Sequence, residues 1–230
     1  MKFPFDVIDL THPLSAEIPS WDVQCGFHCT KTLDYDDCTT DVKFRVQHLR
    51  LPAGIGTHID APAHCIPDGK AVHQLSLNEL LAPCIVIDIS AKADETYLCS
   101  VADIDAHENK YGKIPQKSFI IIRTGWDRYW DNPNQYRNNL QFPSVSKESA
   151  LLLLKRDIVG LGIDTLSPDT EKSGYPVHHI LLSAGKYIIE NIANSRQIPC
   201  VGSFVLGLPL PIIHATEAPM RLIALTPRDI

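Results

Sequence analysis

The chain has 230 residues, of which 44% are hydrophobic and 21% charged, and these proportions predict a globular protein with a substantial buried core. A formal net charge of −6, without a run of lysines and arginines, argues against a nucleic-acid partner, and no apolar stretch reaches the ~18 residues of a membrane span. Because residues 1–15 also lack the apolar core of a secretory signal, we expect a cytoplasmic protein.

Runs rich in β-branched residues predict strands along the chain, at residues 6–12, 43–51, 84–90, 118–125 and 157–165. The fourth run, SFIIIRTG, is almost continuously apolar, which is typical of a strand buried on both faces. Before the second run, the hydrophilic segment 25–41 indicates a flap, or an arm that crosses to a neighbouring subunit.

Helical signals appear later in the chain. The segment 144–157 offers serine caps, a glutamate in the first turn and basic residues in the last turn, and 177–185 predicts a short helix ended by a glycine. A strand is expected at 186–192, and the polar, aromatic stretch 123–139 indicates a loop or a broken helix. This irregular alternation of strands and helices predicts one mixed α/β domain over residues 1–230.

The seven cysteines are an odd number and are scattered through the chain. Their spacing does not suggest a disulfide framework, so we expect free thiols that are buried or incidental. Cys25 and Cys29 have a spacing that could touch a metal, but no second pair matches them.

The stretch GIGTHIDAPAH at residues 54–64 concentrates two histidines and an aspartate. In an extended segment His58 and Asp60 point to the same side, and Pro62 turns the chain so that His64 can return to the same pocket. Imidazole and carboxylate groups are ligands that proteins offer to zinc and manganese. A pair of histidines on a surface strand would explain a lone His-x-Asp, but the third histidine favours a functional site.

A second cluster lies downstream, where His178 precedes the short helix and Glu190 ends the apolar run Tyr187–Ile189. An apolar segment rarely ends in a glutamate unless the carboxylate is paired, bound or exposed to solvent. A solvated glutamate and surface histidines would explain this cluster equally well on its own.

The motif Gly54–His64 resembles the hallmark His-x-Gly-Thr-His-x-Asp-Ala-Pro-x-His of the metal-dependent cyclase-like hydrolases, which include bacterial kynurenine formamidase and isatin hydrolase. The resemblance covers nearly the whole chain. It includes VIDLTHPLSAEIPSW at the start, IIRTGW and GIDTLSPD in the centre, and VHHILL, IIENI and APMRLIAL towards the end.

This resemblance implies a fold of the α/β class, a single domain with a barrel-like sheet flanked by helices of the swivelling β/β/α type, assembled as a homodimer or larger. It implies a small-molecule substrate, namely a small amide, formamide or cyclic acyl compound, that is hydrolysed by a metal-activated water. The metal ligands would be His58, Asp60, His178 and Glu190, holding one or two divalent ions, with zinc preferred over manganese. His64 would move the proton, with Glu190 as a rival for that role if it is not a ligand.

The chain departs from the family pattern at Gly54, which stands where the first motif histidine is expected. Three consequences remain open. The protein could use a single ion, or another group such as His48 or a water could fill the gap. Alternatively, activity could be lost, leaving a catalytically silent relative that binds a metal or small molecule. Cyclase or dehydratase chemistry is a further alternative.

Three aromatic residues, Trp21, Trp126 and Tyr129, could wall an apolar pocket, although sealing the core explains them equally well. His12 follows the first predicted strand, and its side chain could point towards the site or into solvent.

Overall fold

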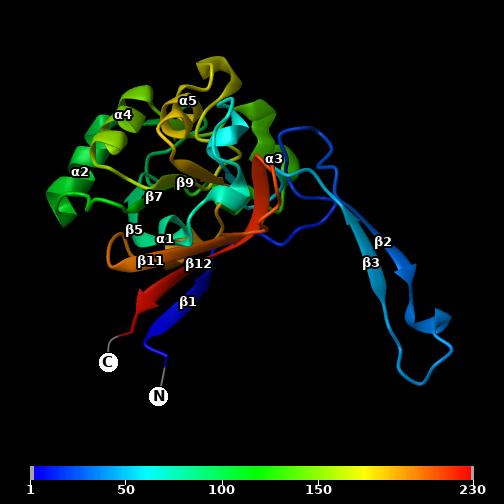
Figure 1. Cartoon of the computed structure of the whole chain (residues 1–230). Helices are drawn as coiled ribbons and strands as arrows, with labels where there is room; N and C mark the ends of the chain where they lie inside the picture. Colours follow the sequence, from blue (N-terminus) through cyan, green and yellow to red (C-terminus); the bar gives the residue numbers. More distant parts are fainter. Residues whose placement is uncertain (1–2, 229–230) are drawn as a thin grey trace.

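The computed structural model describes residues 3–228, and its centre is a sheet that closes on itself (Figure 1). Seven strands of this described part form the ring in the spatial order β12-β11-β5-β7-β9-β10-β4, closed by pairing of β4 with β12, and β1 extends it beside β12. The strands of this sheet are β1 (Phe5–Asp9), β4 (His58–Asp60), β5 (Leu81–Asp88), β7 (Phe119–Arg123), β9 (Gly160–Ile163), β10 (Tyr187–Glu190), β11 (Ser203–Pro209) and β12 (Glu217–Pro227). The predicted α/β class with a barrel-like sheet is confirmed.

The strands β5, β7, β9 and β10 run parallel to one another, so the chain needs a crossover connection between each strand and the next. Three helices supply these crossovers and lie together on the outside of the sheet (Figure 1): α2 (Val101–Tyr111), α4 (Lys147–Lys155) and α5 (Pro176–Ser183). Two shorter helices, α1 (Leu77–Leu80) and α3 (Pro133–Arg137), lie in the connections. None of the helices within residues 3–228 is long and apolar enough to cross a membrane.

Alternating side chains divide the core between the two faces of the sheet. In β7, Ile121 points into the barrel, whereas Ile120 and Ile122 pack outward with residues of the covering helices, among them Leu153 and Leu181. All five residues of β7 are buried, as the run SFIIIRTG predicts. Because the inner face is filled by side chains, a site can form only on the outer face or at a rim.

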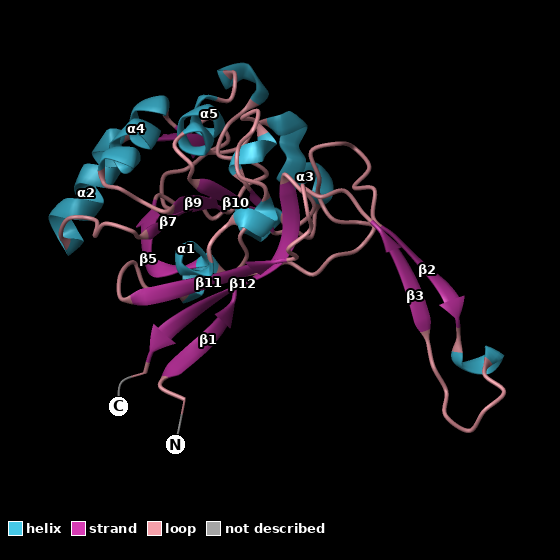
Figure 2. Ribbon diagram, in the orientation of Figure 1, coloured by secondary structure: helices cyan, strands magenta, loops and turns pink. Residues whose placement is uncertain are grey.

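A hairpin of β2 (His28–Leu33) and β3 (Val46–Arg50) projects away from the barrel (Figure 2). The predicted flap or arm at 25–41 is therefore too short, because the strand expected at 43–51 is the returning strand of the same arm. Both strands are almost entirely exposed. A second small pair, β6 (Leu98–Cys99) with β8 (Ser144–Val145), lies elsewhere in the chain.

Candidate active site

Strand β4 aims its polar residues at the outer face of the barrel. Ile59 points into the core, so His58 and Asp60 on either side of it point outward together. Strand β10 pairs with one edge of β4 and places Glu190 opposite His58. Strand β12 pairs with the other edge and places Glu217 opposite Asp60. Residues that oppose each other in antiparallel strands share a face, so four charged or titratable groups meet on three adjacent strands.

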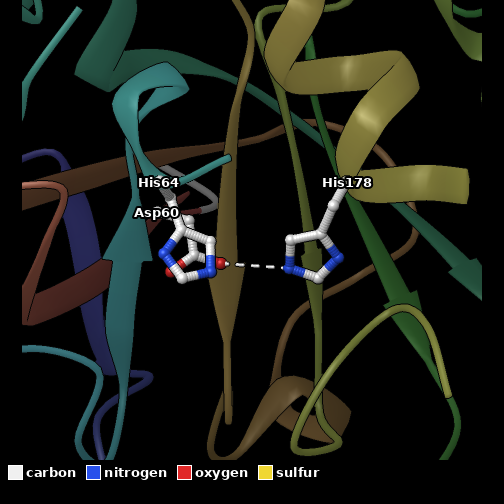
Figure 3. Close-up of side chains that lie close together, drawn as sticks. All are labelled: Asp60, His64 and His178. Atoms are coloured by element: carbon white, nitrogen blue, oxygen red, sulfur yellow. Dashed lines mark ion pairs between the residues drawn. The ribbon is translucent and has the colours of Figure 1, made fainter. Parts of the chain in front are cut away.

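Two more histidines reach the same place from outside the sheet (Figure 3). His64 ends a short 3-10 turn that begins at Pro62, and His178 lies in α5, close to the start of the helix. Their ring centroids are 5.8 Å apart, and Asp60, His64 and His178 each offer a possible ligand atom within 4.8 Å of the other two. The turn at Pro62 therefore returns His64 to the pocket, as the motif predicts.

The carboxylates of Asp60 and Glu190 each present one oxygen to each of two imidazoles. His58 Nε2 lies 3.4 Å from Asp60 Oδ1 and 3.4 Å from Glu190 Oε2. His178 Nε2 lies 3.5 Å from Asp60 Oδ2 and 3.4 Å from Glu190 Oε1. The four side chains thus form two half-sites that share both carboxylates, and we call them the His58 half-site and the His178 half-site.

The spacing of these donors fits a pair of divalent cations. Ligands bonded at about 2.0–2.2 Å to a tetrahedral ion lie roughly 3.3–3.6 Å from one another, and each imidazole Nε2 lies at such a distance from its two carboxylate oxygens. Asp60 is fully buried, and neither of its oxygens has a hydrogen-bond partner among the described residues. A buried carboxylate is costly without compensating charge, so the residues present suit a bound cation.

Both histidines are held so that Nε2 faces the centre. His58 Nδ1 donates to the carbonyl oxygen of Gly56 at 2.8 Å, and His178 Nδ1 donates to Asp169 Oδ2 at 2.8 Å. Asp169 also accepts the backbone N–H groups of His178 at 2.9 Å and of Val177 at 3.1 Å, and it thereby caps the start of α5. Such outer partners fix the tautomer and orientation of metal-binding imidazoles.

The electrostatics of the centre favour positive charge. Burial opposes protonation of His58, but Asp60 and Glu190 outweigh it and raise its pKa to about 10. The pKa of His178 is raised well above its usual value, because Asp169, Asp60 and Glu190 outweigh its burial. Burial and the neighbouring Asp60 raise the pKa of Glu190. The carboxylates therefore favour positive charge at both imidazoles, supplied either by a proton or by a bound cation.

The centre opens into a cavity of about 490 Å³, whose apolar walls include Trp21, Leu166 and Tyr175. His64 lies at this cavity with its side chain about one third exposed, and its Nδ1 is 3.3 Å from Glu217 Oε2. The contact with Glu217 raises the pKa of His64 against the effect of its partial burial. A protonatable group thus stands between the buried carboxylates and the solvent.

Several residues considered from the sequence lie elsewhere. His48, one of the groups considered for the space at Gly54, is instead exposed on β3 in the arm, opposite Thr30. Trp126 and Tyr129 pack against each other outside the cavity, which Trp21 alone of the three aromatic residues lines. His12 is buried and stacks on Trp130, so it belongs to neither of the alternatives expected for it.

Sequence reasoning missed Asp169 and Glu217. Asp169 follows β9 within the stretch GIDTLSPD, and Glu217 begins β12 immediately before APMRLIAL. Both stretches contributed to the family resemblance, but no spacing linked either carboxylate to a histidine.

Comparison with known proteins agrees with this geometry. A family described as Putative cyclase matches residues 8–170. An isatin hydrolase from Roseibium aggregatum is 30% identical over 189 residues, covering 75% of this chain and 72% of that protein. A kynurenine formamidase from Bacillus cytotoxicus is 27% identical over 225 residues, covering 94% and 95% of the two chains.

Solved structures agree as well. An isatin hydrolase bound to the product analogue thioisatinate has a TM-score of 0.89 at 26% identity, covering 98% of this chain and 94% of that one. A predicted metal-dependent hydrolase from Bacillus stearothermophilus has a TM-score of 0.74 at 26% identity, covering 96% and 98%. The sequence match, the shared fold and the motif at residues 54–64 together establish that the chain belongs to the putative cyclase family.

Proposed function

We propose that the protein is a metal-dependent hydrolase that cleaves the carbon–nitrogen bond of a small amide, formamide or cyclic acyl compound. The observation that carries this proposal is the pair of half-sites, in which two buried carboxylates face two imidazoles at 3.4–3.5 Å beside a cavity. The names of the relatives, isatin hydrolase and kynurenine formamidase, support the substrate class.

In this proposal His58, Asp60, His178 and Glu190 hold two divalent ions. Bound divalent ions lower the pKa of a coordinated water and polarise a carbonyl oxygen, which is the chemistry that amide hydrolysis needs. We propose zinc, because imidazole and carboxylate donors at these spacings suit a tetrahedral ion, with manganese as the alternative. Gly56 and Asp169 keep both Nε2 atoms directed at the centre.

His64 is the proposed proton carrier. It lies beside the buried carboxylates and is partly open to the cavity, so it can take a proton from the attacking water and deliver it to the departing nitrogen. Glu190 lies within 3.4 Å of both imidazoles, which supports a ligand role for it and leaves proton transfer to His64. Trp21 and Tyr175 would contact the body of the substrate.

The test combines product analysis with one substitution. An aryl formamide and a cyclic amide are incubated with the zinc- or manganese-loaded protein in ¹⁸O-water. Hydrolysis incorporates one solvent oxygen into the acid product, whereas a cyclase or dehydratase reaction does not. His64→Gln should lower kcat about 10²–10⁴-fold while metal content is unchanged, because general acid–base catalysis contributes about that much. A loaded protein that turns over neither substrate class would favour the catalytically silent, ligand-binding alternative.

The arm supports a second proposal, that the protein forms a homodimer through the β2–β3 hairpin. The hairpin leaves several apolar side chains about half exposed or more, including Val42, Phe44, Val46 and Leu49. Exposed apolar groups on a projecting hairpin are typical of a contact with another subunit. Light scattering should give a dimer for the intact chain and a monomer for a variant with Phe44→Ser and Leu49→Ser. A monomeric intact chain would contradict the proposal.

We also propose that the protein works in the cytoplasm. All seven cysteines are free thiols, which suits a reducing compartment. Fractionation of the native cells should recover it with cytoplasmic markers, and recovery with secreted proteins would contradict this assignment.

A further inference from the structure

The space at Gly54 is occupied by the side chain of Glu217. A Cβ atom built on Gly54 would overlap Glu217 Oε1 and would lie 3.1 Å from Glu217 Cδ. The same point lies 3.4 Å from His58 Nε2. The carboxylate of Glu217 therefore lies where a side chain at position 54 would begin, and this position faces the His58 half-site.

The backbone explains how a residue so far along the chain reaches this space. Strand β12 pairs with β4 and places Glu217 opposite Asp60, on the face that carries the half-sites. Glu217 lines the same cavity as His58 and Asp60, and its side chain is only 22% exposed. One of its oxygens fills the space at Gly54, and the other lies 3.3 Å from His64 Nδ1.

Three carboxylates lie around the His58 half-site. Asp60, Glu190 and Glu217 surround it from three adjacent strands, and like charges placed opposite each other in a sheet are destabilising. His64 can pair with one Glu217 oxygen. Asp60 faces the imidazoles of His58 and His178 at 3.4 and 3.5 Å, but neither of its buried oxygens has a hydrogen-bond partner among residues 3–228. A divalent ion in the His58 half-site would compensate these charges together.

We infer that Glu217 is a metal ligand that replaces the side chain missing at Gly54, so that the His58 half-site retains four protein donors. This inference rests on the proposed metal-dependent function and deepens it. It gives the half-site one imidazole and three carboxylates, which favours harder cations such as manganese more than a site with two imidazoles would. It also makes Glu217 a direct link between the bound ion and His64.

The test measures metal binding, not turnover, in a set of variants at positions 54 and 217. Chelator competition and metal analysis are applied to the intact chain and to Glu217→Ala, Glu217→Gln, Gly54→His and the double variant with Gly54→His and Glu217→Ala. The Co²⁺ absorption spectrum reports coordination independently of activity. Glu148→Ala, which removes an exposed carboxylate on α4, serves as the matched control.

We expect two ions for the intact chain and for the control. Glu217→Ala should lower the affinity for one of the two ions by more than ~100-fold, because loss of a partner that only orients a ligand already lowers metal affinity about 10–100-fold. Glu217→Gln should weaken it less, since the amide oxygen remains. The double variant should regain the second ion, because removing the carboxylate clears room for the histidine, whereas Gly54→His alone should not.

Two results would overturn the inference, and they are distinguishable. If the intact chain and Glu217→Ala both hold two ions with equal affinity, Glu217 is not a ligand, although the proposed hydrolase function stands. If the intact chain binds no ion, the proposed function fails as well. Circular dichroism in the presence of chelator shows whether each variant is folded. If Glu217→Ala does not fold, Glu217→Gln and the double variant still decide the test.

Discussion

Replacement of Asp169 by asparagine should weaken both the His178 half-site and the start of α5. Asp169 is buried and accepts three N–H groups, from His178 Nδ1 at 2.8 Å and from the backbone of His178 and Val177 at 2.9 and 3.1 Å. An asparagine keeps one acceptor oxygen and turns an NH₂ group, which can only donate, towards at least one of these donors.

The magnitude follows from the donors left without a partner. One buried donor without an acceptor costs about 1–3 kcal/mol, and a protein of this size loses roughly 2–4 °C in Tm per kcal/mol. The imidazole of His178 is also no longer fixed with Nε2 facing the centre. Loss of such an outer partner typically lowers metal affinity about 10–100-fold.

The assay separates the two effects. Chelator competition gives the affinity of each ion, and thermal unfolding in excess chelator gives the stability of the chain alone. Asp157→Asn is the matched control, because Asp157 pairs with Lys117 and Lys186 at a partly exposed position outside the cavity. If Asp169→Asn binds both ions within threefold of the intact chain, His178 does not depend on Asp169 and the description of the half-site is wrong.

Three further perturbations test other parts of the molecule. Removal of divalent ions should lower Tm by about 5–10 °C relative to protein at 100 times the dissociation constant, because such binding stabilises the folded state by about 2.7 kcal/mol; an unchanged Tm would contradict a bound cation. Burial lowers the pKa of His12 from 6.5 to about 4, so the unfolded chain takes up the proton first. The contribution of neutral His12 to the free energy of unfolding should therefore be fully present above pH 6.5 and smaller by about 2 kcal/mol at pH 5. His12→Phe keeps an aromatic ring on Trp130 and should remove this loss of stability, which denaturant titrations at the two pH values measure. Gly160→Ala should lower the free energy of unfolding by about 1–3 kcal/mol, because the added Cβ would lie 2.8 Å from the backbone oxygen of Tyr187 in the neighbouring strand. A decrease below ~0.5 kcal/mol in urea unfolding would show that β9 and β10 can move apart to make room for the methyl group.

The sequence predicted those parts of the fold whose signal is local. The apolar run of β7, the capped helix α4 and the pair His58 and Asp60 in an extended segment could all be recognised from adjacent residues. Helix α2 was not expected, because its sequence VADIDAHENKY is mostly polar and Ile104 is its only large apolar residue in the core. Strand β3 was expected, but its place in the projecting arm was not, since β-branched residues do not distinguish a strand in the barrel from one in an arm.

The candidate site shows the same limit. His58, Asp60 and His64 are close in sequence, and the structure brings them together with His178 and Glu190 as the motif resemblance implied. Glu217 could not be assigned because its place depends on the register between β12 and β4, which the pairing of the closed barrel sets. The side chain that occupies the space at Gly54 can therefore be recognised only from the three-dimensional structure.

The central claim is that carbon–nitrogen bond hydrolysis depends on ions held between His58 and His178. The most direct measurement is a titration of chelator-treated protein with zinc or manganese, in which hydrolysis of an aryl formamide and of a cyclic amide is recorded against the number of ions bound per chain. We predict no turnover of the effective substrate without ions, and a rate that rises with added ion and becomes constant at two ions per chain. Equal hydrolysis before and after complete removal of the ions would contradict the claim.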